Sequence, residues 1–126
     1  MKKNLIRNNE EDHILLYGER EIVYLMLKDI LYIEAHGNYS IFHMRNEKKF
    51  VSCHKLKYYE ELLEEANFFR ISRSYIVNKA CIKYYHTDTR ELILTNSFIA
   101  FVSFRRRKLF LNSIYKSNHT AKAMVG

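Results

Sequence analysis

The chain has 126 residues and a formal net charge of +7, and its length favours one domain. It contains no proline and only three glycines, which excludes collagen-like, linker-like and low-complexity proteins. No apolar run approaches the roughly 20 residues that a membrane helix needs. The polar, acidic stretch after the first basic residues does not fit a signal peptide, so we expect a cytoplasmic protein.

Strand-like segments separated by turn signals occupy most of the chain. Each segment is rich in Ile, Leu, Val, Phe or Tyr, and polar breaks such as Gly37-Asn38 lie between them. In chain order, the predicted strands cover residues 13–17, 21–27, 30–34, 39–44, 50–54, 68–77, 82–86, 90–95 and 98–102. Short strands at this spacing predict a mainly β fold with short helices, a β-rich α+β class of small antiparallel sheets.

Two segments show helical periodicity instead. In residues 56–66, apolar side chains at 56, 59, 62, 63 and 66 form one stripe of an amphipathic helix, and Lys57 is placed to pair with Glu60 and Glu61 at its surface. A second helix after Ser103 is expected to turn Leu109, Phe110 and Ile114 inward, with Leu111 as a further candidate. We expect a loosely packed or disordered segment 1–12, a domain over 13–113, and a helix end with a flexible tail over 114–126.

The stretch 68–78, FFRISRSYIVN, places a polar interruption between two apolar clusters. In a regular strand Ile71 and Arg73 would share one face, so burying Ile71 would also bury an uncompensated charge. We therefore predict a bulge or irregular turn at residues 72–74 that directs Arg73 outward.

The basic charge is concentrated in the second half of the chain. Residues 1–67 hold 10 Lys or Arg and 12 Asp or Glu, a net of −2, whereas residues 68–126 hold 11 and 2, a net of +9. Such asymmetry indicates a polyanionic partner, nucleic acid first and an anionic membrane surface second. A basic surface that only maintains solubility explains the charge alone equally well.

The densest basic segment runs from Arg105 to Lys108. If Ser103 caps the second helix, these cations fill its first turn, where they oppose the helix dipole. A bound phosphate would reverse that penalty. The placement therefore favours phosphate contact over a solvated basic run.

Two other loops carry candidate ligand groups. Arg73 can pair with a base edge, with guanine as the usual partner, or with a surface carboxylate of its own chain. Ser72 and Ser74 can donate to phosphates or satisfy a bulged backbone. In the loop 35–40, AHGNYS, the donors are His36, Asn38 and Tyr39, and the Tyr39 ring fits the core equally well.

Catalytic and metal motifs are not found. The six histidines are scattered, and no HExxH motif, nucleophile elbow or glycine-rich phosphate loop occurs. Cys53 and Cys81 fit neither a disulfide framework nor a zinc site, and both are expected to be small buried side chains. We expect no enzyme activity, cofactor, metal or small-molecule substrate.

Four motifs together resemble the LytTR DNA-binding domain: DILYIEAHGNYS (29–40), LKYYEELLEEA (56–66), FFRISRSYIVN (68–78) and VSFRRRK (102–108). The resemblance covers roughly residues 13–113 and departs from the family pattern at Ser72, commonly His, and at Phe104, commonly Arg. It implies a cytoplasmic bacterial transcription regulator, often part of a two-component system as a response regulator, that inserts loops into successive major grooves at promoter direct repeats.

By motif position the resemblance places base contacts at Tyr39, Arg73 and Arg105. Phosphate contacts are expected from other polar residues of the same loops, namely His36, Asn38, Ser40, Ser72, Ser74, Ser103, Arg106, Arg107 and Lys108.

The expected partner is double-stranded DNA, on which the protein forms a homodimer. A regulatory membrane protein or a receiver domain is expected as a further partner. A receiver domain does not fit into the first twelve residues, so the chain is either a stand-alone regulator or the C-terminal domain of a longer one. Two other functions remain open: a β domain that binds single-stranded DNA or RNA through exposed aromatic residues, and a basic protein-interaction module.

Overall fold

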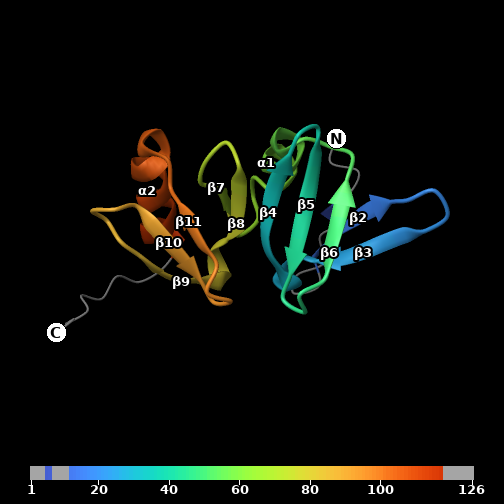
Figure 1. The fold of residues 1–126 in the computed structure, drawn as a ribbon, viewed down its shortest axis with the longest axis horizontal. Coiled ribbons are helices and arrows are strands. Elements are labelled where there is room, and N and C mark those ends of the chain that lie inside the picture. The colour runs from blue at the N-terminus through green and yellow to red at the C-terminus, as the bar shows by residue number, and fades with distance from the viewer. Residues whose placement is uncertain (1–4, 7–11, 118–126) are drawn as a thin grey trace.

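The computed structural model describes residues 5–6 and 12–117, which form three antiparallel sheets and two α-helices (Figure 1). The first sheet contains β1 (Leu5–Ile6), β2 (His13–Tyr17) and β3 (Ile22–Met26). The central sheet contains β4 (Ile30–His36), β5 (Tyr39–Met44), β6 (Lys49–Ser52), β7 (Phe68–Arg70) and β8 (Tyr75–Asn78). The third contains β9 (Ile82–Tyr85), β10 (Glu91–Leu94) and β11 (Ile99–Phe101). The helices are α1 (Leu56–Leu62) and α2 (Arg107–Ser117).

The predicted β-rich fold of small antiparallel sheets is confirmed. The central sheet has the order β6-β5-β4-β8-β7, and the third has the order β11-β10-β9. Part of the N-terminal segment joins the first sheet, because β1 pairs with β2. Residues 1–4 and 7–11 of the expected loose segment, and the tail from residue 118, lie outside the described residues.

The central sheet separates two hydrophobic cores. One core packs the first sheet and α1 against one face, and the other packs the third sheet and α2 against the opposite face. Strand β4 serves both, since Ile30 and Ile33 enter the first core while Leu31 and Tyr32 enter the second. This explains the unbroken apolar run at the start of β4, because a strand buried on both faces has no polar side to display.

The helices follow their apolar periodicity with one exception. The apolar stripe predicted for residues 56–66 is buried at Leu56, Tyr59, Leu62 and Leu63, but α1 ends at Leu62, so the predicted helix is too long at its C-terminal end. In α2, Phe110 is completely buried, but Leu109 is 63% exposed, so its predicted inward position is wrong. One residue rotates the side chain by roughly 100° around a helix, so Leu109 faces solvent when its neighbour Phe110 faces the core.

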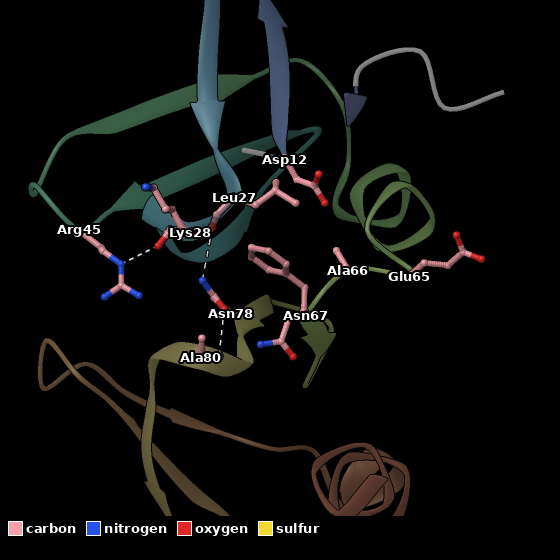
Figure 2. A pocket seen from close by; sticks show the side chains of 10 residues that line it. Asp12, Leu27, Lys28, Arg45, Glu65, Ala66, Asn67, Asn78 and Ala80 are labelled. Carbon is pink, nitrogen blue, oxygen red and sulfur yellow. Dashed lines mark hydrogen bonds between the residues drawn. The ribbon is translucent and has the colours of Figure 1, made fainter. Parts of the chain in front are cut away.

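Asn78 is a buried polar residue at the end of β8. Its side chain is only 3% exposed. Its amide nitrogen donates to the carbonyl oxygen of Ile30 at 2.9 Å, and its oxygen accepts from the Ala80 amide at 3.0 Å. Figure 2 shows it in a cavity of about 340 Å³, which Asn67 also lines.

Replacing Asn78 with alanine should lower the free energy of unfolding by about 1–3 kcal/mol, because it removes the donor to a buried carbonyl. Chemical denaturation would measure the change. Asn67→Ala is the matched control, because this exposed side chain lines the same cavity, and it should stay within about 0.5 kcal/mol of the parent. Equal losses in the two variants would contradict a structural role specific to Asn78.

Candidate nucleic-acid interface

Three loops meet at one edge of the molecule. The turn after β4 and the loop before β8 share an end of the central sheet, because β4 and β8 are antiparallel neighbours. The Ala35 amide donates to the Ser74 carbonyl oxygen at 2.8 Å, and the Ser103 amide donates to the Ile71 carbonyl oxygen at 2.8 Å. Figure 1 shows the β4–β5 and β7–β8 loops along its upper edge. The loops 36–40, 71–74 and 103–108 contain no acidic residue.

The loop 71–74 turns a hairpin between β7 and β8. The predicted interruption is confirmed, but it is a hairpin loop rather than a bulge within one strand. Ile71 is completely buried, whereas Arg73 and Ser74 are exposed. The Ser72 hydroxyl accepts from the Ser74 amide at 3.1 Å. The hairpin therefore resolves the conflict between Ile71 and Arg73 by separating their directions.

Arg70 holds this hairpin in shape. Its Nε donates to the Ser72 carbonyl oxygen at 3.0 Å, and its Nη2 donates to the Arg73 carbonyl oxygen at 3.0 Å. The side chain is 15% exposed. Sequence reasoning missed Arg70, because its place at the end of a strand does not reveal that its fork reaches back over the loop.

The turn between β4 and β5 presents an aromatic and two polar side chains. Gly37 has a φ of +60°, the left-handed conformation that glycine adopts without strain. His36 and Asn38 are exposed, and Tyr39 is 52% exposed rather than part of the core. Ser40 differs from expectation, because it is completely buried and donates to the His54 carbonyl oxygen at 2.7 Å. It is directed away from any surface ligand.

The basic segment begins in a short 3₁₀ helix, Phe104–Arg106, and continues into α2. The α-helix starts only at Arg107, so the expectation that all four cations fill its first turn is wrong. Ser103 precedes the 3₁₀ helix but makes no side-chain capping bond. Arg105 and Lys108 are exposed.

Phe104 contacts one of these cations, Arg107, through both its ring and its carbonyl oxygen. Its ring is 62% exposed. The guanidinium carbon of Arg107 lies 3.6 Å from the ring centroid, and Nη1 of Arg107 donates to the Phe104 carbonyl oxygen at 2.6 Å. The departure from the family pattern at this position thus supplies an aromatic surface on which Arg107 stacks.

Glu60 of α1 connects the hairpin with the basic segment. Its Oε1 accepts from Nη1 of Arg70 at 2.9 Å, and its Oε2 accepts from Nη1 of Arg106 at 3.3 Å. Burial alone would raise the pKa of the Glu60 carboxyl, but the hydrogen bond from Arg70 and the charge of Arg106 outweigh it and lower that pKa. Sequence reasoning paired Glu60 with Lys57, because spacing along one helix cannot reveal partners from other segments such as β7 and the 3₁₀ helix Phe104–Arg106.

The two cysteines lie in different surroundings. Cys53 is exposed, contrary to expectation, while Cys81 is buried as expected. Within residues 5–6 and 12–117, no three His, Cys, Asp or Glu side chains gather to hold a metal ion. Neither described helix has the length and hydrophobicity to span a bilayer.

Comparison with known proteins identifies the family of the chain. The family described as the LytTr DNA-binding domain matches residues 20–114. The chain belongs to the LytTR family. Its fold is similar to the solved LytTr DNA-binding domain of a Bacillus cereus protein, with a TM-score of 0.70 and 24% identity over 82% of this chain and 96% of that one. No curated protein matches the chain.

Family membership makes this LytTR chain a DNA-binding domain involved in transcription regulation. The expectation that this chain binds DNA is therefore confirmed.

Proposed function

We propose that this LytTR domain binds double-stranded DNA sequence-specifically, with the three-loop edge inserted into successive major grooves at promoter direct repeats. The observation that carries the proposal is the gathering of three loops at one edge, all free of acidic residues and two of them bearing exposed cations. DNA presents closely spaced phosphates, so an edge of this kind gains affinity by displacing counterions.

The side-chain roles follow from exposure. Arg73, Arg105 and Tyr39 are exposed at the edge, and we assign them to base contacts, since an arginine fork matches the major-groove edge of guanine. Four further exposed residues are assigned to phosphates: His36, Asn38, Ser74 and Lys108.

Four partly buried residues of the same loops can also reach phosphates: Ser72, Ser103, Arg106 and Arg107. A guanidinium has five N–H donors, so Arg106 and Arg107 can bind phosphate while keeping their internal contacts. The Ser72 hydroxyl accepts one hydrogen bond and keeps its own proton to donate.

The regulatory setting is inferred from the family. The Bacillus cereus domain is described as part of a methyl-accepting/DNA response regulator. We assign the present chain to a bacterial response regulator, and we propose that two of its copies occupy a direct repeat. A receiver domain or a membrane protein would control the pair.

Binding to duplex DNA should fall steeply with salt. If four cations of the edge neutralise phosphates, raising the salt from about 50 to about 200 mM should lower affinity about 10²-fold. A duplex selected from a random pool by the protein should keep an increment of at least about 10³-fold over random duplex. Fluorescence anisotropy at several salt concentrations would measure both quantities.

Two outcomes would redirect the proposal. Equal affinity for selected and random duplexes would remove sequence specificity. Strong competition by a poly-pyrimidine strand would instead favour binding of single-stranded nucleic acid by exposed aromatic residues.

A further inference from the structure

We propose that Glu60 is a positioning residue for DNA recognition, which locks the basic segment against the Arg73 hairpin so that both approach DNA in a fixed relation. The inference rests on the proposed function and assigns a role to a residue outside the three loops. It predicts that Glu60 governs specificity without touching DNA.

The contacts join three elements through one carboxylate. Each Glu60 oxygen accepts from a different arginine: Oε1 from Arg70 and Oε2 from Arg106. Nη1 of Arg106 also donates to the Arg70 carbonyl oxygen at 3.2 Å. Arg70 in turn binds the carbonyl oxygens of Ser72 and Arg73. A continuous chain of bonds therefore leads from Arg106 through Glu60 to the backbone of Arg73.

The surroundings strengthen these bonds. The side chains of Arg70, Arg106 and Glu60 are 15%, 33% and 37% exposed, and they line a cavity of about 200 Å³ together with apolar residues. Those apolar residues are Leu63, Phe68, Phe69 and Ile76, and the exposed side chain of Glu64 lines the same cavity. Charges beside apolar groups are screened less than fully solvated ones, so this network orients its members better than a surface pair would.

Loss of the Glu60 charge has two opposite consequences for DNA binding. The two arginines would lose the carboxylate that accepts from both, so the side chain of Arg106 would keep only its 3.2 Å bond to the Arg70 carbonyl oxygen and would be held less firmly against the hairpin. Arg106 would then be released toward solvent and phosphate. Affinity for any DNA should rise, while discrimination between sequences should fall.

Glu60→Gln tests this directly, with Glu61→Gln as the matched control. Glu61 is exposed on the same helix, so both variants change the net charge equally and leave the side-chain size unchanged. Anisotropy titrations would use the duplex selected by the parent protein and a random duplex of equal length. Thermal unfolding of both variants would establish that they remain folded.

We expect Glu60→Gln to reduce the ratio of specific to random affinity about tenfold, the effect of weakening one good base contact. Its affinity for random duplex should exceed that of Glu61→Gln, and its salt dependence should be steeper. A merely structural role would weaken both duplexes together. Identical ratios in the two variants would overturn the role of Glu60, provided that the parent discriminates.

A second variant, Arg106→Gln, removes the donor of the bond between Arg106 and Glu60. Arg106→Gln should also reduce the specificity ratio, but it should lower affinity for random duplex because a cation is lost. If Glu60→Gln does not fold, an unchanged ratio in Arg106→Gln would overturn the proposal by itself. If the parent protein selects no sequence at all, the proposed function fails and this inference fails with it.

Discussion

Replacing Arg73 with alanine should weaken binding to the selected duplex by about 1–3 kcal/mol, because a bidentate contact to a base edge is lost. Affinity for random duplex should fall much less, since most of it comes from phosphate contacts. The fold should remain intact, because the side chain of Arg73 is exposed and the hairpin backbone is held by hydrogen bonds from Arg70. Paired titrations and a thermal unfolding curve would measure the three effects.

Lys48→Ala is the control for charge. Lys48 is exposed between β5 and β6, at the end of the central sheet opposite the three loops. It should leave the specificity ratio within about twofold of the parent, since a distant rim charge acts mainly through long-range attraction. A large drop in the melting temperature of Arg73→Ala would instead mean that Arg73 supports the fold.

Phe110→Ala should produce the largest loss of stability, about 3–5 kcal/mol in the free energy of unfolding. The ring is completely buried and lies 5.6 Å from the Phe69 ring and 5.0 Å from the Tyr85 ring, centroid to centroid. Its removal leaves a cavity between α2, β7 and the third sheet. Urea denaturation followed by far-UV circular dichroism would measure the change.

Leu109→Ala supplies a neighbouring control on the same helix. Because Leu109 is 63% exposed, the substitution should change stability by no more than about 0.5 kcal/mol. Comparable losses for the two variants would mean that α2 is rotated relative to the structure described above. The pair thus tests the phase of the helix as well as the depth of the core.

Local pattern was enough to predict much of the fold. The strand at residues 39–44 has the bounds of β5, because a polar turn on each side limits it. The α1 stripe was found because its apolar spacing matches the helical repeat. The conflict between Ile71 and Arg73 was also visible from alternation alone, and it led to the exposed Arg73.

What escaped prediction depends on contacts between distant segments. Ser40 is polar and follows a turn, yet it is buried because the chain after β6 brings the His54 carbonyl oxygen to its hydroxyl. Glu60 finds Arg106, 46 residues further along the chain. Spacing within one helix or strand carries no information on such partners. The candidate loops were therefore predictable, whereas the residues that hold them in place were not.

The clamp that Arg70 places on the hairpin has a consequence for substitutions at position 73. It grips carbonyl oxygens of Ser72 and Arg73, and every residue type offers a carbonyl oxygen in the same place. The shape of the hairpin is thus largely independent of the side chain at position 73. Substitutions at this position should therefore leave the fold of this domain intact, and under the proposed role of Arg73 in base contact they should change the target sequence on one scaffold.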